Sequence, residues 1–414
     1  MATAHLVIPS DDRQRQMVLA FGKRLPVLPV GDMFRAGELL GLQLAVVRTV
    51  ARMGDDRVVL CELLDVDAPT VDGAAWIDAA RVADEPPVKA ALSAWSNDEL
   101  PEAALLPWER DGWFREVMAW VDGTLAARSV VRIDRPLQLR HWGLSAVLRV
   151  PTDDGHVIVK QVPSGLGAEG RVTAWLAALV PGAVPAVIAA DHELNRFVME
   201  AVAASTPVEH GDVLALAAIQ LAAANRRAEL ERLGVPDRCP VALVDATRQL
   251  ANRDDLLFES GWSLASTDTR RPPRPVTTDD VAGLLRLVDE IEPLTRRLEE
   301  NLPEGTILHG DYHMGNVVRT DRRTVVIDWG LAAIGHPLFD LPAWPSWDGH
   351  DEQVLMPFLD AWRCSLDEWT RVRPLAFLFH AATAAHVADS MPSTHRRTEW
   401  AAGVQKMILR ALAT

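Results

Sequence analysis

The sequence predicts an α+β fold in which a small β-rich lobe precedes a large helical lobe, with an additional small α/β domain in front of both. Three observations predict this fold. The 414 residues are too many for one ordinary domain. Short apolar runs joined by turn residues fill residues 134–201, and helical spacing takes over from about residue 212. We therefore expect an accessory domain over residues 1–105, a small lobe with a leading helix over 106–202, and a helical lobe over 203–414.

Composition and charge argue against several classes of partner. Hydrophobic residues make up 49% of the chain and charged residues 24%, as in ordinary globular proteins. The formal net charge of −15 argues against nucleic acid and acidic membrane surfaces, because both need clustered Lys and Arg. The most apolar stretch, residues 213–224, is too short to cross a bilayer. We expect no nucleic acid and no membrane partner, and the sequence leaves the oligomeric state open.

Cysteine usage indicates the compartment. The three cysteines are far apart and form no CxxC pair, so neither a zinc site nor a disulfide framework is predicted. The N-terminus has no basic region before an apolar core, so we see no signal peptide. These features suit a reducing cytoplasm, where we expect the protein to be.

The accessory domain is predicted to contain a β-hairpin and two helices. Leu42–Ala51 and Arg57–Val66 are rich in Val and Leu, and the residues between them include the turn-forming Gly-Asp-Asp. Trp76–Arg81 and Val88–Trp95 look helical, with a break at residues 84–87, which include two prolines.

The small lobe is predicted to follow an amphipathic helix that ends near Leu125. Asp153-Asp154-Gly155 is a strong hairpin turn, and a helix opens with Glu169 in its first turn. The strands are expected at Pro136–His141, Ala146–Pro151, His156–Val162, Val187–Ala190 and Arg196–Ala201.

The helical lobe is interrupted by two short strands, Thr306–Leu308 and Thr324–Ile327. Before them, Thr278 is a good N-cap for a long helix that Pro293 should kink or end. Residues 338–414 have the spacing of further helices.

Residues 309–316, His-Gly-Asp-Tyr-His-Met-Gly-Asn, lie between these two strands and carry the clearest chemical pattern. Phosphoryl transfer to a hydroxyl needs a carboxylate beside the acceptor and hard oxygen ligands for magnesium. Asp311 would orient the hydroxyl and accept its proton. Asn316 follows at the Asp-to-Asn spacing of the protein-kinase catalytic loop, and Asp328 ends an apolar strand. Taken alone, each residue is typical of a turn, a cap or a solvated strand end; their joint spacing favours kinase chemistry.

A phosphate anchor is expected on a central strand of the small lobe. Lys160 ends an alternating strand, and Glu169 at the next helix start is the natural partner to orient it. Alone, Lys160 is typical of a solvated strand end and Glu169 of a favourable charge at a helix N-terminus. Together with the downstream motif, the functional pair is the favoured interpretation.

Contacts to the rest of a nucleotide are less clearly marked, since there is no GxGxxG. Gly143 and Ser145 stand in the turn where a phosphate-covering loop would lie. Residues 197–202 would link the lobes, so that backbone groups near Glu200 and Val202 could contact an adenine edge. An ordinary edge strand explains the same residues equally well.

These motifs resemble the aminoglycoside phosphotransferase and choline kinase-like superfamily over roughly residues 130–345. The resemblance rests on His-Gly-Asp-x-His-x-x-Asn at 309–316, Ile-Asp-Trp-Gly at 327–330 and Gly-x-Pro-x-x-Asp-Leu at 335–341. It implies a two-lobed, protein-kinase-like fold that uses ATP and Mg²⁺, with GTP not excluded.

The resemblance also assigns residue roles. It implies that Asp311 is the catalytic base, that Asn316 and Asp328 bind magnesium, and that Lys160 contacts the nucleotide phosphates while Glu169 holds it. The residues implied to support the active-site loops are His309, His313 and Asp340.

The acceptor is expected to be a small molecule with a free hydroxyl. An aminoglycoside or related antibiotic is one expectation; an amino sugar, another sugar or an amino alcohol stays open. Tyr312 stands where the family usually has an apolar residue, which indicates either substrate specificity or simple packing. Asp348, Asp351 and Glu352 form an acidic cluster that could bind a cationic acceptor, although a solvated loop explains it as well.

Two further hypotheses remain. The chain could be a non-catalytic binding protein on a kinase fold, although base, metal ligands and Lys are all present. Residues 1–105 are faintly similar to a Nudix-type domain, but lack its spaced glutamates, so we expect no hydrolase; a cap domain of another origin is equally compatible.

Overall fold

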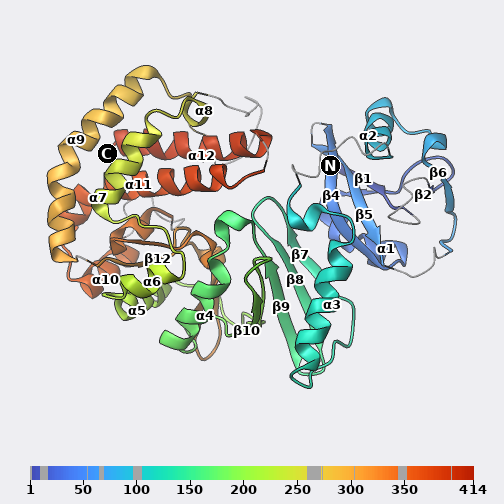
Figure 1. Cartoon of the computed structure of the whole chain (residues 1–414), viewed down its shortest axis with the longest axis horizontal. Helices are drawn as coiled ribbons and strands as arrows, with labels where there is room; N and C mark the ends of the chain where they lie inside the picture. The colour runs from blue at the N-terminus through green and yellow to red at the C-terminus, as the bar shows by residue number, and fades with distance from the viewer. Residues whose placement is uncertain are drawn as a thin grey trace. The chain divides into compact units, whose positions relative to one another are not determined.

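The computed structural model describes residues 2–9, 17–53, 55–64, 70–96, 105–258, 272, 274–302, 304–343, 352–392 and 394–414. The chain divides into two compact units, Met1–Gln161 and Val162–Thr414 (Figure 1). The predicted α+β class is confirmed, because both units combine helices with short sheets. The domain boundaries predicted near residues 105 and 202 stay predictions.

The first unit begins with a four-stranded sheet in the order β3-β1-β5-β4. Strands β1 and β5 are parallel, and the other neighbours are antiparallel. The β4–β5 pair is the predicted hairpin. The elements of this part are β1 (Thr3–Val7), β2 (Met17–Ala20), β3 (Val27–Pro29), α1 (Ala36–Leu40), β4 (Leu44–Met53), β5 (Asp56–Leu63), β6 (Ala75–Asp78) and α2 (Pro86–Ser96).

The helix predicted at Trp76–Arg81 is wrong over its first half. Strand β6 pairs antiparallel with β2, with Leu19 opposite Trp76, so a partner distant in sequence overrides the local pattern. The Asp78 side chain then accepts a hydrogen bond of 2.8 Å from the Ala80 amide and opens a 3-10 turn over Ala79–Arg81. Helix α2 is confirmed.

The rest of the first unit is helix α3 (Trp113–Ala126) and the antiparallel strands β7 (Leu137–His141), β8 (Ala146–Thr152) and β9 (Gly155–Gln161). Gly155 closes the predicted β8–β9 turn with φ +105°. The Gln138 side chain on β7 bonds both the amide and the carbonyl of Val46 on β4, at 2.7 and 2.9 Å. The accessory sheet and this meander are therefore tied together by a buried side chain.

The second unit is mainly helical (Figure 1). Its helices are α4 (Glu169–Leu179), α5 (Val213–Ala223), α6 (Arg227–Arg232), α7 (Pro240–Leu250), α8 (Asp254–Leu257), α9 (Thr278–Asn301), α10 (Glu352–Trp362), α11 (Leu366–Asp389) and α12 (Thr394–Leu412). Antiparallel pairs join β10 (Val187–Asp191) to β11 (Arg196–Glu200), β12 (Thr306–Leu308) to β15 (Ala333–Gly335), and β13 (Val317–Arg319) to β14 (Thr324–Val326).

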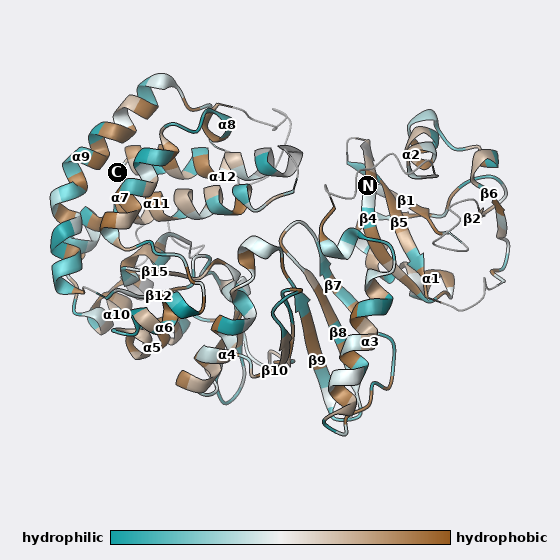
Figure 2. Ribbon diagram, in the orientation of Figure 1, coloured by the Kyte–Doolittle hydropathy of each residue, from teal (hydrophilic) through white to brown (hydrophobic). Residues whose placement is uncertain are grey.

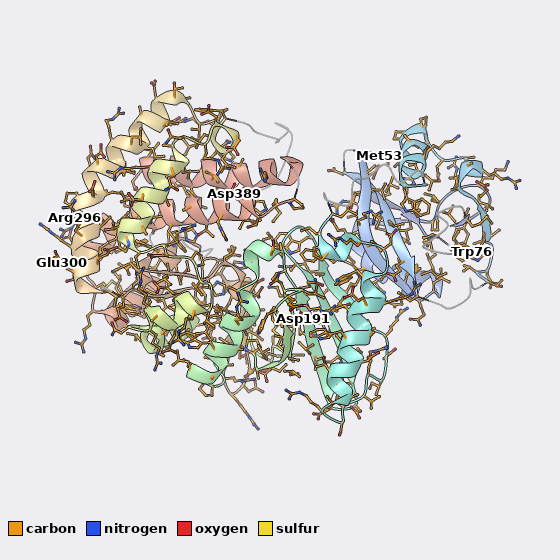
Figure 3. All side chains as sticks on the ribbon, viewed as in Figure 1. Met53, Trp76, Asp191, Arg296, Glu300 and Asp389 are labelled. Atoms are coloured by element: carbon orange, nitrogen blue, oxygen red, sulfur yellow. The ribbon has the colours of Figure 1, made fainter. Side chains whose placement is uncertain are left out.

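Helix α11 forms the centre of this unit and packs along α12. Helix α9 lies at its outer side, where polar and apolar residues alternate along the ribbon (Figure 2) and the exposed Arg296 and Glu300 project outward (Figure 3). No helix among the described residues is both long and apolar enough to span a bilayer.

Two details of α9 differ from the prediction. Thr277, not Thr278, is the N-cap, and it forms a capping box with Asp280. Pro293 does not end the helix, which continues to Asn301. Ile291, Thr295 and Leu298 are buried on one face around the proline, so tertiary packing offsets the hydrogen bond that proline removes.

Candidate active site

Two short antiparallel strand pairs position residues 309–328. The loop leaves β12, and its end enters β13, whose Val317 lies opposite Val326 of β14. The Ile327 amide then donates to the Asn316 carbonyl at 2.9 Å, so the pairing extends one residue beyond the strands. Asn316 and Asp328, the predicted metal ligands, therefore lie at the same end of this hairpin.

The loop is held from its buried side by Asp340. The Asp340 carboxylate accepts hydrogen bonds of 2.7 Å from the amides of His309 and Gly310, and one of 2.9 Å from the Gln220 side chain. Its side chain is fully buried, and this burial raises the pKa of Asp340 to about 7, while the three donors act in the opposite direction. Asp340 thus contacts the backbone of the loop directly, and its supporting role in the active site stays a prediction.

His309 joins the loop to the strand that carries Asp328. Its Nε2 lies 2.9 Å from the Ile327 carbonyl, and its Nδ1 accepts from the Asp311 amide at 3.3 Å. The ring is completely buried, which lowers the pKa of His309 and keeps it neutral. A neutral ring with hydrogen on Nε2 satisfies both contacts, so the imidazole fixes the backbone on either side of Asp311.

Gly310 is required by the same packing. Its φ is +80°, and an added Cβ would lie 2.2 Å from the Leu331 carbonyl oxygen. Both the left-handed backbone and the close approach of Leu331 exclude any side chain at this position.

The other side of the loop presents the predicted base. The Asp311 side chain is 51% exposed, and His313 Nε2 lies 3.6 Å from its Oδ2. His313 Nδ1 accepts from the Gly315 amide at 3.0 Å, which fixes the ring. Asn316 Nδ2 donates to the Asp311 carbonyl at 2.9 Å, so the amide oxygen of Asn316 is left as its ligand atom. The loop thus directs one accessible carboxylate outward from a fixed backbone.

Asp328 adopts a left-handed backbone, φ +68° and ψ 61°, which non-glycine residues seldom adopt. A Cβ at the neighbouring Gly330 would lie 3.1 Å from Glu169 Oε2 and 3.7 Å from Asp328 Oδ1. The buried Glu169 in the first turn of α4 and Asp328 therefore flank the same glycine.

The donor atoms of Asn316 and Asp328 fit magnesium, which prefers oxygen ligands and commonly uses one or two carboxylates together with phosphates and water. Among the described residues, no group of three or more His, Cys, Asp and Glu could hold a metal without further ligands. Magnesium commonly completes its coordination with phosphate oxygens and water, which a nucleotide and solvent would supply here.

The residues predicted to contact a nucleotide differ in burial and in the hydrogen bonds that they already make. Lys160 lies on β9 and is buried, and the Ser145 hydroxyl accepts from Trp142 Nε1 at 3.0 Å in the turn that contains Gly143. The Glu200 amide donates to the Ala186 carbonyl at 2.9 Å, and the Glu200 carboxylate pairs with Arg323 at 2.9 Å. The amide of Glu200 is thus already used.

The predicted substrate residues lie elsewhere or outside the described residues. Tyr312 is buried in the core of the second unit, where its hydroxyl donates to the Asp212 carbonyl at 2.8 Å; burial raises the pKa of Tyr312. This environment favours the packing interpretation of Tyr312, and its role stays a prediction. Asp348 and Asp351 lie outside the described residues. Glu352 is the first residue of α10, and its side chain is not among those described.

Two supporting residues were missed from the sequence. His380 on α11 is half-buried, and the removal of its ring from water lowers the pKa of His380 to about 4. Gln220 on α5 bonds Asp340. Each is a lone polar residue within an apolar helical run, and this pattern could have identified them.

The sequence model of the phosphotransferase enzyme family matches residues 136–375, more than half of the chain. A stretch of 110 residues is 31% identical to acyl-CoA dehydrogenase family member 11 of Pongo abelii and 32% identical to that of Homo sapiens. It covers 24% of this chain, and the chain spans about 14% of the length of these curated relatives.

Three solved structures illustrate the structural similarity. Macrolide 2'-phosphotransferase type I is 18% identical, with 72% of this chain and 95% of that chain covered and a TM-score of 0.45. Choline kinase LicA from Streptococcus pneumoniae is 13% identical, with 72% of this chain and 99% of that chain covered and a TM-score of 0.45. Spectinomycin phosphotransferase, solved with ADP and spectinomycin, is 12% identical, with 69% of this chain and 92% of that chain covered and a TM-score of 0.39.

Proposed function

Because the chain belongs to the phosphotransferase enzyme family, we propose that it is a small-molecule kinase that moves the γ-phosphate of ATP to a hydroxyl group. One observation carries the proposal: an accessible carboxylate, Asp311, projects from a loop whose opposite side is fixed by Asp340 and His309. Phosphoryl transfer depends mainly on positioning and charge, so a base on a rigid loop is the central protein part that it needs.

Each loop residue then has a chemical task. Asp311 accepts the proton of the acceptor hydroxyl and orients its oxygen toward the phosphate. Asn316 and Asp328 would hold magnesium, which when bound neutralises charge on the phosphate oxygens. His309 and Asp340 position the loop without contacting the reactants.

We propose nucleotide contacts for the residues that the sequence predicts. Lys160, oriented by Glu169, would contact the phosphates, and the turn at Gly143 and Ser145 would cover them. Since the Glu200 amide is already bonded, the Val202 amide and the Glu200 carbonyl are the better candidates to contact adenine. ATP is the expected donor, with GTP as the alternative.

The acceptor is proposed to be an aminoglycoside or related antibiotic, or else an amino sugar, another sugar or an amino alcohol. ADP release across a panel of these four classes, with ATP or GTP and magnesium, tests the proposal. Turnover with one class would identify the acceptor. Nucleotide binding without turnover for any hydroxyl compound would favour the non-catalytic binding protein. We also propose a cytoplasmic location, which the free thiols of Cys61, Cys239 and Cys364 suit.

The metal role is tested by Asp328→Asn. Asparagine tolerates the left-handed backbone and removes the charge, so folding should be preserved. Affinity for ATP in the presence of magnesium should fall at least about tenfold, while affinity measured with EDTA should change little. The matched control is Asp245→Asn on the exposed face of α7, which should change neither value. Equal magnesium-dependent affinity in Asp328→Asn would remove Asp328 from the metal site.

A further inference from the structure

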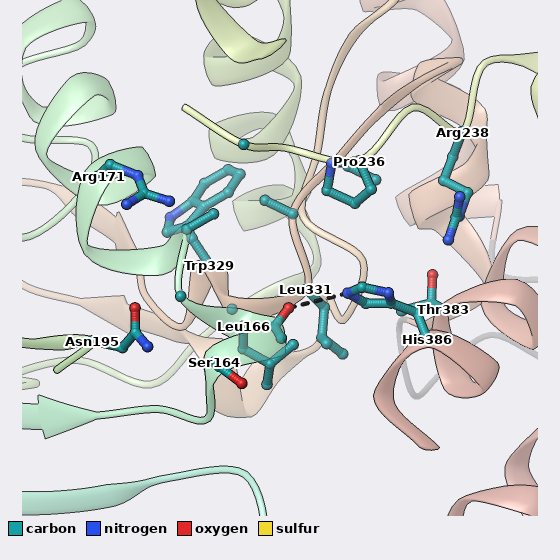
Figure 4. Close-up of a pocket in the computed structure, with 17 residues that line it drawn as sticks. Ser164, Leu166, Arg171, Asn195, Pro236, Arg238, Trp329, Leu331, Thr383 and His386 are labelled. Carbon is teal, nitrogen blue, oxygen red and sulfur yellow. Dashed lines mark hydrogen bonds between the residues drawn. The ribbon is translucent and has the colours of Figure 1, made fainter. Parts of the chain in front are cut away.

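A cavity of about 180 Å³ lies in the second unit next to the catalytic loop (Figure 4). Its walls come from the turn before α4, the segment before α7, the residues after Asp328, and α11. Leu331 connects it to the loop, because Leu331 lines the cavity and its carbonyl approaches Gly310. No carboxylate is among the described residues that line it.

Two arginines give this cavity its charge. Arg171 from α4 and Arg238 lie on opposite sides of it (Figure 4). Arg171 Nε donates to the Leu233 carbonyl at 3.1 Å, and Arg238 Nη1 donates to the Asp237 carbonyl at 3.1 Å. In the part of the chain that the structure describes, neither guanidinium has a carboxylate within 4 Å.

The carboxylate of Asp237, the residue before Arg238, is already engaged. The Asp237 carboxylate contacts the Arg227 guanidinium and accepts from the Cys239 amide at 2.9 Å. Burial lowers the pKa of Arg238, as expected for a guanidinium held partly away from water. A guanidinium stays charged in proteins, so two half-buried cations that form no ion pair with a described carboxylate face the same space.

The cavity is also held in shape. His386 Nε2 lies 3.1 Å from the Gly165 carbonyl, which joins α11 to the turn before α4 (Figure 4). The Thr383 hydroxyl donates to the Phe379 carbonyl at 2.9 Å. Guanidinium groups match the planar or branched oxygen arrangement of carboxylates and phosphates, so a fixed pair of them favours such an anion.

We propose that this cavity binds a phosphate or carboxylate group between Arg171 and Arg238. Its volume is about six times the share of one water molecule in the liquid, enough for one such group with a few attached atoms. The site lies outside the roles given to Asp311, Asn316, Asp328 and Lys160, so it does not depend on the proposed kinase activity.

Inorganic phosphate is the probe, titrated calorimetrically into the full chain without nucleotide or magnesium. We expect saturable binding that weakens at least about tenfold in Arg238→Gln and in Arg171→Gln. The matched control is Arg297→Gln, which removes one exposed charge from α9 and should bind phosphate like the wild type. Arg238→Lys keeps the charge but loses the planar set of guanidinium N–H donors, and should bind phosphate with intermediate affinity.

Three outcomes would overturn the proposal: no saturable binding by the wild type, equal affinity in all variants, or equal weakening in Arg297→Gln. Thermal unfolding of each variant without phosphate shows that it is folded, so a binding loss cannot be mistaken for unfolding. A loss confined to the Arg171 and Arg238 variants establishes the site even if no acceptor for phosphoryl transfer is found.

A second arm identifies the source of the anion. Pairs of hydroxylated acceptors that differ only by a carboxylate or phosphate group are compared in the kinase assay. If the acceptor carries the anion, Arg238→Gln raises KM at least about tenfold for the anionic member alone, and free phosphate competes with it. If the anion is a separate molecule, phosphate binds without competing with either acceptor. Arg238→Gln then changes the KM of the anionic and the neutral acceptor of each pair by the same factor.

Discussion

Asp311 and Asp340 are two carboxylates on opposite sides of one loop, and their environments are opposite. The Asp311 side chain is 51% exposed, whereas Asp340 is fully buried and accepts three hydrogen bonds. Burial raises the pKa of Asp340 to about 7. The loop thus separates an accessible carboxylate from one whose hydrogen bonds hold the backbone in place.

The largest expected effect comes from Asp311→Asn, which keeps the shape of the accessible side and removes its base. The turnover number should fall about 10³-fold or more, a loss within the range for a general base. The free energy of unfolding should change by less than about 0.5 kcal/mol, because the side chain is half exposed. ADP release and urea unfolding measure the two quantities, with Asp245→Asn as control. Retained turnover would show that Asp311 is not the base.

Gly310→Ala should instead disrupt the packing on the buried side of the loop and destabilise the protein. A Cβ would lie 2.2 Å from the Leu331 carbonyl on a backbone with φ +80°, so the free energy of unfolding should fall by about 4 kcal/mol. Gly283→Ala is the matched control: it lies inside α9, where the nearest atom is 3.4 Å away in a flexible Leu412 side chain, and should be neutral or slightly stabilising. Similar unfolding curves for both variants would refute the tight packing at Gly310.

Asp340→Asn tests the buried carboxylate through the pH dependence of the free energy of unfolding. Between about pH 4 and 7 the folded protein keeps a proton on Asp340 that the unfolded chain has lost, so this group makes the wild type less stable as pH rises. The variant has no such dependence. At pH 7 it should be about 2 kcal/mol less stable than the wild type, because one amide donor loses its acceptor. At pH 5 the difference should be larger by on the order of 2 kcal/mol.

The measurement is urea unfolding of both proteins at pH 5, 6 and 7. Burial also lowers the pKa of His336 and His380 to about 4, which makes both proteins less stable as pH falls below 6.5; that contribution cancels in the difference. A difference that stays constant with pH would contradict a raised pKa for Asp340.

Tyr312→Phe should have the smallest effect. It removes the hydrogen bond to the Asp212 carbonyl, so the free energy of unfolding should fall by about 1 kcal/mol. The KM for the acceptor should not change, since the residue lies on the buried side of the loop. An altered KM for the acceptor together with an unchanged free energy of unfolding would indicate that Tyr312 contacts the acceptor.

Much of the loop and its strands could be predicted because their partners are close in sequence. The turn at residues 321–323 brings β13 and β14 together, and the pairing extends to Asn316 and Ile327. The turn at Asp153-Asp154-Gly155 joins β8 to β9 in the same way. Residues a few positions apart interact through local turn chemistry, which residue types reveal directly.

The errors and omissions involve distant partners. Trp76 is a strand residue because β2 pairs with it. Gln220 reaches Asp340 over 120 residues, and Tyr312 reaches Asp212 over 100. Residue types give no distance between such pairs, so a lone polar side chain in an apolar helix could be noticed but not assigned a partner.

From the sequence alone came the pattern that predicts the chemistry: a carboxylate, an amide and a second carboxylate at fixed spacing on either side of a hairpin. Only the tertiary structure decided which side of the loop is buried, why Gly310 admits no side chain, and that Arg171 and Arg238 face one cavity. The reason is physical. Spacing along a chain fixes neighbours within a turn or hairpin, whereas burial, pKa and charge compensation depend on groups that meet only when distant segments pack together.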